Sequence, residues 1–163
     1  MVAKEIVLNS IGKIKTPWKT VNNMPIQPIG AKGIKGIIEL FPEYETGLNL
    51  LNEFSHIILI YQLHLVENPQ LEVIPFMDTT SKGIFATRSP KRPNKLGMSI
   101  VEIEKVEGSN IYIKDVDMLN DTPLLDIKPF FEDFDNRFNT KKGWLANKSD
   151  LNKGTKKSDK RFM

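Results

Sequence analysis

Residues 83–99 hold the side chains of this chain that are best suited to bind a charged ligand. A short apolar run ends there in a turn-rich segment that carries Arg88 and Arg92 together with Pro90 and Pro93. Each proline fixes its own φ at about −65° and favours extended geometry in the residue before it, so this loop is irregular but stiff. A guanidinium group on a stiff loop suits the binding of an anion or a carboxylate. A solvated surface turn is the alternative interpretation of the same residues.

The composition narrows the classes of protein to which the chain can belong. A length of 163 residues suits one domain with a substantial hydrophobic core. The chain has no cysteine for a disulfide or a thiolate metal site, and its two histidines are too few for a histidine-rich metal site. No apolar stretch approaches the roughly 20 residues of a membrane helix, and residues 1–12 do not resemble a signal peptide. We therefore expect a cytoplasmic protein with neither a metal ion nor a membrane partner.

The charge is distributed unevenly along the chain. The net charge is +3, but residues 1–134 hold 14 basic and 17 acidic side chains, whereas residues 135–163 hold 9 basic and 3 acidic ones. A mildly acidic body therefore ends in a basic tail. Such a tail can contact phosphate groups, which would make an affinity for RNA fall with salt. A solubilising C-terminus is the alternative.

Alternating and continuous apolar runs predict a protein made mainly of short strands. The expected strands are Glu5–Lys13, Ile34–Leu40, His56–His64, Gly83–Thr87, Ser99–Val106 and Asn110–Val116. The last two are joined by residues 107–109 and form the clearest hairpin. The strand that begins at His56 is nearly continuous in Ile, Leu and Tyr, which is typical of a strand buried on both sides. One helix is expected at Glu45–Phe54, where apolar residues recur at helical spacing.

This pattern favours a fold that is mainly β with some α, a small β-barrel with helical decoration. No Gly-x-Gly-x-x-Gly follows the first strand and no regular alternation of strands and helices is present, so we do not expect a Rossmann fold. The barrel domain is expected over residues 1–135 and a basic extension over residues 136–163. Asn68–Val73 and Asn139–Lys160 are expected to be irregular.

Five segments carry a further signal, because they match motifs of a known family. The most specific is the run from Ala86 to Pro90 with Arg92-Pro93-Asn94, and the supporting segments are Gly12–Pro17, Pro25–Pro28, Tyr44–His64 and Asp115–Pro129. Together they resemble the TsaA-like family, also called the YaeB or TrmO-type family, of S-adenosylmethionine-dependent tRNA methyltransferases. The resemblance covers about four-fifths of the chain. It implies a β-barrel fold, S-adenosylmethionine as cofactor, tRNA as partner and a homodimer.

The resemblance also implies a cofactor site made from five places in the chain. The residues that match the family's cofactor site are Pro25, Ile26, Gln27, His64, Leu65, Arg88, Met98, Met118, Leu119, Asn120 and Asp121. In this interpretation Arg88 binds the methionine carboxylate or the ribose, and Met98 is an adaptable apolar wall. Taken singly, these residues also have ordinary structural explanations, such as His64 at a strand end or Met118 in a core.

One motif departs from the family's pattern. The family has Asp-Gly-Thr-Pro where this chain has Asn120-Asp121-Thr122-Pro123, so Asp121 replaces a glycine that can adopt positive φ. Aspartate tolerates that region better than most residues, and we expect the turn to survive. The substitution also adds a negative charge near a cationic cofactor.

The reaction that the resemblance implies is methyl transfer to N6 of threonylcarbamoyladenosine beside the anticodon of tRNA. That nitrogen belongs to a urea group and is a poor nucleophile until it loses a proton, so a base would help. The sequence offers Tyr44, Asp121 and Asp126 as candidate bases and does not select among them.

The substrate's threonyl carboxylate needs a cationic partner. Lys91, Arg92 and Lys95 share the loop of Arg88 and are assigned to the substrate, while Arg88 is assigned to the cofactor. Two alternatives stay open: methylation of another RNA or of a small metabolite, and a non-catalytic barrel that binds the cofactor or RNA.

Overall fold

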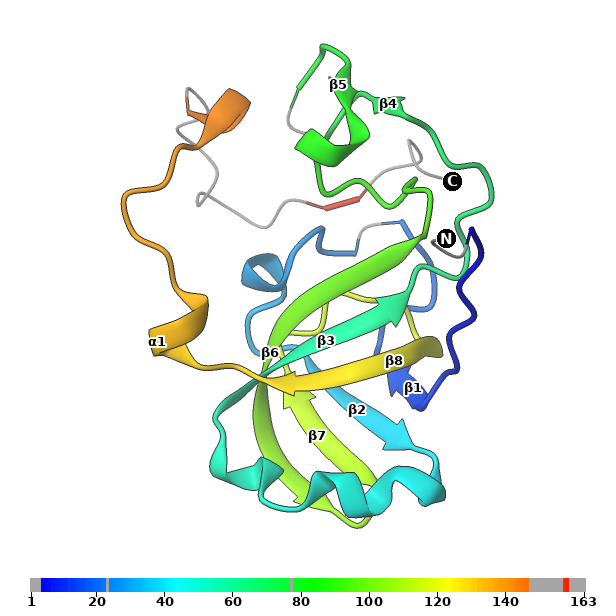
Figure 1. Cartoon of the computed structure of the whole chain (residues 1–163), viewed down its shortest axis with the longest axis vertical. Helices are drawn as coiled ribbons and strands as arrows, with labels where there is room; N and C mark the ends of the chain where they lie inside the picture. Colours follow the sequence, from blue (N-terminus) through cyan, green and yellow to red (C-terminus); the bar gives the residue numbers. More distant parts are fainter. Residues whose placement is uncertain (1–3, 23, 77, 147–156, 159–163) are drawn as a thin grey trace.

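The computed structural model describes residues 4–22, 24–76, 78–146 and 157–158. Within these residues, six strands form one closed antiparallel barrel in the order β1-β2-β7-β6-β3-β8 (Figure 1). The strands are β1 (Gly12–Lys15), β2 (Lys35–Leu40), β3 (His56–Gln62), β6 (Leu96–Glu107), β7 (Asn110–Lys114) and β8 (Thr122–Pro129). The predicted fold class is therefore confirmed.

The other elements are short. β4 (Glu72–Val73) and β5 (Lys82–Gly83) pair with each other outside the barrel. The α-helix is α1 (Glu132–Asp135), and the 3-10 helices are η1 (Pro28–Ala31), η2 (Pro42–Leu48), η3 (Leu51–Glu53), η4 (Ile84–Ala86) and η5 (Gly143–Leu145). In the part of the chain that the structure describes, no helix has the length and apolar character needed to cross a membrane.

Every second residue of the strands fills the barrel, because successive side chains of a strand point to opposite faces. Ile57, Leu59 and Tyr61 of β3 are buried in this way, and so are Ile111 and Ile113 of β7. They form one core cluster with Ile14, Ile38, Leu40, Leu48, Val101, Val116, Met118 and Leu124. This apolar interior is the main source of the barrel's stability.

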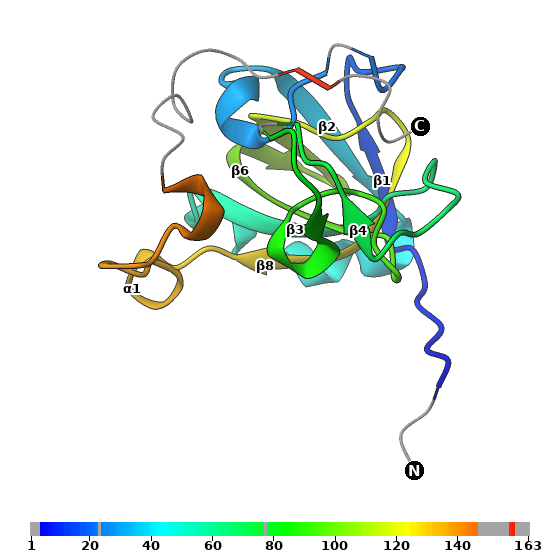
Figure 2. The same cartoon turned by 90° about the horizontal axis from the view of Figure 1, so that it is seen from above.

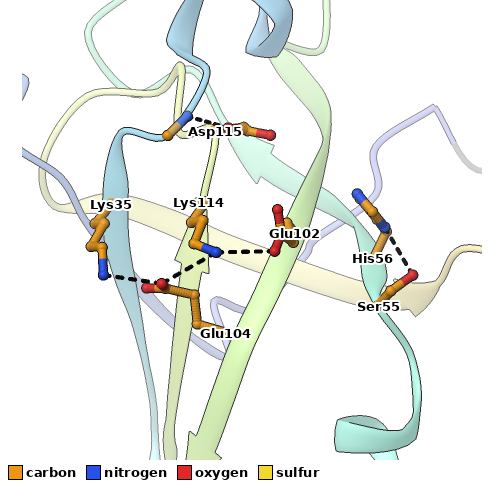
Figure 3. Close-up of polar contacts among 8 residues, drawn as sticks. Lys35, Ser55, His56, Glu102, Glu104, Lys114 and Asp115 are labelled. Atoms are coloured by element: carbon orange, nitrogen blue, oxygen red, sulfur yellow. Dashed lines mark hydrogen bonds and ion pairs between the residues drawn. The ribbon is translucent and has the colours of Figure 1, made fainter.

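Ion pairs join the outer wall of β2, β6 and β7. Glu104 lies 3.0 Å from the Lys35 ammonium and 3.3 Å from that of Lys114, which also lies 3.0 Å from Glu102 (Figure 3). The two lysines lower the pKa of Glu104, with the Lys35 hydrogen bond as the largest cause. Water and dissolved salt screen exposed pairs of this kind, so they add little to the stability that the core provides.

The predicted strand Glu5–Lys13 is wrong over most of its length. β1 begins at Gly12, which pairs with Leu40, the last residue of β2. The ladder with β2 therefore ends at Gly12. Ile11 still donates its N–H to the Leu124 carbonyl and accepts from the Phe41 N–H, but the apolar side chains of Ile6 and Val7 are exposed. An alternating sequence forms a strand only where another strand can pair with it.

Two further elements have a different type from the prediction. Glu45–Phe54 forms η2 and η3 instead of an α-helix, because Leu50 between them adopts a φ of 65°, in the left-handed region. Gly83–Thr87 forms the last residue of β5 and η4, with Thr87 donating from its backbone and its hydroxyl to the Ile84 carbonyl. That apolar run is too short to span the barrel wall.

Two differences concern the barrel strands themselves. The sequence patterns do not predict β8. This strand carries Pro123 near its start and Pro129 at its end, and prolines argue against a strand in a sheet. β3 is predicted to be buried on both sides, yet Ile58 and Ile60 on its outer face are only half buried. The closed barrel buries one face of each strand and leaves the other near solvent.

The connections that carry most of the predicted cofactor residues meet at one end of the barrel, the upper end in Figure 1, which faces the viewer in Figure 2. β1, β3 and β7 run toward this end, and β2, β6 and β8 start from it, so residues 16–34, 63–95 and 115–121 connect strands there. We call this end the mouth. The opposite end holds η2, η3 and the β6–β7 turn.

Candidate functional site

The start of β6 lies beside the exit of β3 at the mouth. The Leu63 N–H donates a 2.8 Å hydrogen bond to the Lys95 carbonyl, which brings the segment of His64 and Leu65 close to the start of β6. Within the β3–β6 ladder, Met98 pairs with Ile60. Three of the predicted cofactor residues therefore come from two adjacent segments.

The Pro25–Gln27 segment reaches the same end of the barrel. Gln27 is the N-cap residue of η1, and η1 contacts β6. Pro25 is buried and pairs with Lys157 in an isolated β-bridge, while the Ser158 N–H donates to the Met24 carbonyl at 2.8 Å. Two residues of the predicted basic extension thus dock on this segment.

The turn that leads into β8 is held rigidly against the connection that follows β1. The Thr16 hydroxyl donates to the Met118 carbonyl at 2.9 Å, and the Thr16 N–H donates to Asn120 Oδ1 at 3.1 Å. The Asn120 N–H in turn donates to the Trp18 carbonyl at 2.7 Å. Met118 is buried, so its backbone is fixed although its side chain belongs to the core.

Asp121 adopts the conformation expected of a residue in place of glycine. Its φ is 62°, in the left-handed region, which confirms that the turn survives the substitution. The Lys15 ammonium lies 2.5 Å from Asp121 Oδ1. This hydrogen bond is the largest cause that lowers the pKa of Asp121, and the charge of His64 lowers it further.

A buried hydrogen-bond chain closes the barrel interior at the mouth, and the sequence analysis missed it. The Ser99 hydroxyl donates a 2.6 Å hydrogen bond to the Asp117 carboxylate. Because the Ser99 proton points to Asp117, the 3.0 Å contact between Tyr61 and Ser99 has the Tyr61 hydroxyl as its donor. Ser99 is a polar residue at an inward position of β6, and this feature of the sequence could have indicated a buried hydrogen bond.

Burial and the neighbouring groups have opposite effects on the pKa of Asp117. Burial raises the pKa of Asp117 to about 6, while the Ser99 hydrogen bond and the charge of Arg88 act in the opposite direction. Arg88 is exposed, yet its guanidinium is close enough to act on this carboxylate. Burial also raises the pKa of Tyr61, with the charge of Asp117 as a second cause.

Arg92 stabilises the loop on which Arg88 lies. Its guanidinium donates to the Thr87 carbonyl at 2.8 Å and to the Ile84 carbonyl at 3.2 Å. It also lies 5.8 Å from the ring centre of Phe85, whose side chain is exposed. Two of its donors are therefore used inside the loop. Lys91 and Lys95 lie on the same loop, and Lys95 adopts a φ of 50°.

The three candidate bases lie in different parts of the barrel. Tyr44 is in η2, at the end opposite the mouth. Asp126 is in β8, where it lies 2.7 Å from the Lys128 ammonium. Asp121 is at the mouth, but its ion pair with Lys15 lowers its pKa and makes it a weaker base.

Part of the apolar surface at the mouth is open to solvent. Met98 is 52% exposed and Leu65 is 56% exposed, although both are apolar. Leu96 and Ile100, which alternate with inward residues of β6, are also exposed. The candidate site therefore has apolar walls, a cation, a half-buried acid and fixed backbone carbonyls, a combination that suits a ligand with both an aromatic part and charged groups.

Among protein families, the model that matches describes the tRNA-methyltransferase O N-terminal domain and covers residues 13–136. This range contains the barrel strands except Gly12, the first residue of β1, and every segment of the mouth described above except residues 157–158.

Individual relatives give the same result. A probable S-adenosyl-L-methionine-binding protein of Pyrococcus abyssi is 47% identical over 140 residues, which cover 86% of this chain and 76% of that protein. A mouse tRNA (adenine(37)-N6)-methyltransferase is 32% identical over 142 residues, which cover 82% of this chain and 32% of the mouse protein.

Solved structures of similar fold include TrmO from Pseudomonas aeruginosa. Its crystal structure matches with a TM-score of 0.73 and 29% identity over 86% of this chain and 62% of that chain. The chain spans less than two thirds of the length of the TrmO chains that it matches.

Proposed function

Because this chain belongs to the family of the tRNA-methyltransferase O N-terminal domain, we propose that it methylates N6 of the adenosine beside the tRNA anticodon, using S-adenosylmethionine. We further propose that the acceptor is threonylcarbamoyladenosine and that the enzyme acts in the cytoplasm. The observation that carries this proposal is the meeting of all five predicted cofactor segments at one end of the barrel.

The residues at the mouth fit such a cofactor chemically. S-adenosylmethionine combines an adenine with a sulfonium cation and an amino-acid head that carries both charges. Exposed apolar side chains, Leu65 and Met98, offer the contact that an aromatic ring needs, and the Arg88 guanidinium matches a carboxylate. The Met118 and Leu119 carbonyls accept hydrogen bonds from Thr16 and Thr122, so the backbone in this turn is held in a fixed orientation.

The protein's contribution to the reaction is mainly alignment. The cofactor supplies a methyl group already activated by the positive sulfur. The chain must hold the acceptor nitrogen in line with the carbon–sulfur bond, and a rigid loop and a rigid turn serve that purpose. The Arg92 hydrogen bonds and the Thr16 hydrogen bonds fix these two segments.

RNA binding is assigned to the cationic side chains around the mouth. Lys91, Arg92 and Lys95 follow Arg88 in the loop, and the predicted basic extension begins beyond α1. That extension returns to the body of the protein, because the Trp144 indole donates to the Ala86 carbonyl at 2.8 Å. Its exposed residues Lys141 and Lys142 lie just before this contact. We expect the RNA affinity to fall steeply with salt.

The outer face of β3 and β6 supports a homodimer. Ile58 and Ile60 are half buried there, and their ladder partners Ile100 and Met98 are exposed. A contiguous apolar strip beside a cofactor site is typical of an interface. Ile100→Glu should shift the molecule toward a monomer in analytical ultracentrifugation, whereas Leu50→Glu at the opposite end should not.

The proposed function can be tested with labelled S-adenosylmethionine and two tRNA preparations, one with and one without the threonylcarbamoyl group. We expect label in methylated threonylcarbamoyladenosine after nucleoside analysis, and only with the modified tRNA. Arg88→Ala should abolish the transfer through loss of cofactor binding.

Other outcomes would contradict parts of the proposal. Label in another nucleoside or in a small metabolite would contradict the proposed acceptor. Cofactor binding without any transfer would contradict an enzymatic role. Absence of binding by calorimetry would remove the cofactor assignment itself.

A further inference from the structure

Arg88 and Asp117 present charges of opposite sign at the mouth. The Asp117 carboxylate is anchored by the 2.6 Å hydrogen bond from Ser99, whose side chain points into the barrel near the start of β6. The Arg88 guanidinium acts electrostatically on this carboxylate. Asp117 also lies directly before Met118, the first residue of the predicted cofactor turn.

We propose that Asp117 is a cofactor-binding residue whose carboxylate receives the α-ammonium group of S-adenosylmethionine while Arg88 binds the carboxylate of the same head group. This inference rests on the proposed function, because it concerns the same cofactor. A zwitterionic head is matched by a cation and an anion held at neighbouring positions, since each charged group then finds a partner of opposite sign.

Burial and hydrogen bonding favour Asp117 over the other acids discussed for the site. Asp121 already has the Lys15 ammonium at 2.5 Å, and Asp126 has that of Lys128 at 2.7 Å. Asp117 has a hydroxyl donor and a guanidinium nearby, and its carboxylate is largely removed from water. A buried anion gains most from a cation that arrives with the ligand.

The burial of the Asp117 carboxylate gives the binding a pH dependence whose sign follows from the raised pKa. With a pKa of about 6, Asp117 is ionised at neutral pH and protonated below pH 6. The groups that face it are Ser99 from β6, Tyr61 from β3 and Arg88 from the loop before β6. Tyr61 stays neutral in this range because burial raises its pKa, and a guanidinium stays charged. Affinity for the head group should therefore fall as the pH drops through 6.

Calorimetric titration with two ligands tests the inference. S-adenosylhomocysteine carries the zwitterionic head, and 5′-methylthioadenosine shares its nucleoside and thioether but lacks the head. We expect Asp117→Asn to lower the affinity for S-adenosylhomocysteine by roughly 10- to 100-fold, the range of a hydrogen bond between charged groups. The affinity for 5′-methylthioadenosine should change by less than about 2-fold. Glu107→Gln, an exposed acid at the end of β6 opposite the mouth, is the control and should change the affinity for neither ligand.

The pH series on the unmodified chain gives an independent result that needs no variant. The affinity for S-adenosylhomocysteine should fall below pH 6 and that for 5′-methylthioadenosine should not. If Asp117→Asn loses affinity equally for both ligands, the role of Asp117 is purely structural and the inference is overturned. Unchanged affinity with lost methyl transfer would make Asp117 a base instead. Failure of the unmodified chain to bind either ligand would refute the proposed function rather than this inference alone.

Discussion

The Lys15 ammonium and the Asp121 carboxylate lie 2.5 Å apart, joining the end of β1 to the turn that enters β8. Asp121 stands at a φ of 62°, where glycine is the least strained residue. The lysine therefore neutralises the charge that the aspartate brings to the mouth. This pair offsets the negative charge of the residue that stands in place of glycine beside the candidate site.

Asp121→Gly should be tolerated, because the relief of backbone strain offsets the loss of an exposed, solvent-screened ion pair. Asp121→Val should destabilise the fold by about 1–2 kcal/mol, since a β-branched residue fits positive φ poorly. Urea unfolding of both variants measures the difference. A valine variant as stable as the glycine variant would show that the turn is not strained at this position.

Gly97→Ala should disturb the hydrogen-bond chain at the mouth. Gly97 pairs with Tyr61 across the β3–β6 ladder, and a Cβ added to it would overlap the buried Tyr61 ring. We expect a destabilisation of about 1–3 kcal/mol, the usual cost of overpacking, together with weaker cofactor binding. Gly47→Ala is the control, because a Cβ there has no atom within 4 Å. Equal thermal stability of the two variants would contradict this account of Gly97.

Arg92→Lys should separate the charge of this residue from its hydrogen bonds. A lysine keeps the positive charge that RNA binding needs but cannot reproduce the two bonds of the guanidinium to the Ile84 and Thr87 carbonyls. If the loop depends on those bonds, Arg92→Lys and Arg92→Ala should both increase amide hydrogen exchange over residues 84–95. If Arg92→Lys shows the same amide exchange rates as the unmodified chain, the main role of Arg92 is its positive charge.

The local parts of the fold could be predicted from the sequence, because they depend on neighbouring residues. The hairpin around residues 107–109 follows from a turn between two apolar runs, and β6 and β7 lie where it places them. Residues 5–11 carry a similar apolar pattern but lie outside β1, since pairing depends on where β2 ends. Long-range partners decide such cases.

In the candidate site, too, local features could be predicted from the sequence and long-range contacts could not. The φ of Asp121 could be anticipated, because it depends on the residue type that the position requires. The hydrogen bond from Ser99 to Asp117 could not, since it joins β6 to a turn 18 residues later and exists only when the barrel is closed. The role of Arg92 inside its loop depends likewise on a backbone conformation that no spacing of residues reveals.

Asp117→Asn should stabilise the protein at neutral pH, because burial of the ionised carboxylate lowers the free energy of unfolding. The pKa of Asp117 is raised from 3.8 to about 6, so the folded state favours the protonated form. Its favourable contribution is complete below about pH 4 and is lost as the pH rises through 6. An asparagine at this position can still accept the Ser99 proton and carries no charge. We expect a gain of about 1–3 kcal/mol at pH 7.5.

The advantage of Asp117→Asn should disappear at pH 4, where the aspartate of the unmodified chain is itself protonated. Thermal unfolding of both proteins at the two pH values measures this difference, with Asp126→Asn as the control for an exposed acid on the barrel wall. A variant less stable than the unmodified chain at pH 7.5 would mean that Asp117 is stabilised by its neighbours rather than destabilised by burial. A variant that is more stable yet binds S-adenosylhomocysteine less tightly would indicate that the charge is retained for the ligand, since functional sites commonly sacrifice stability in this way.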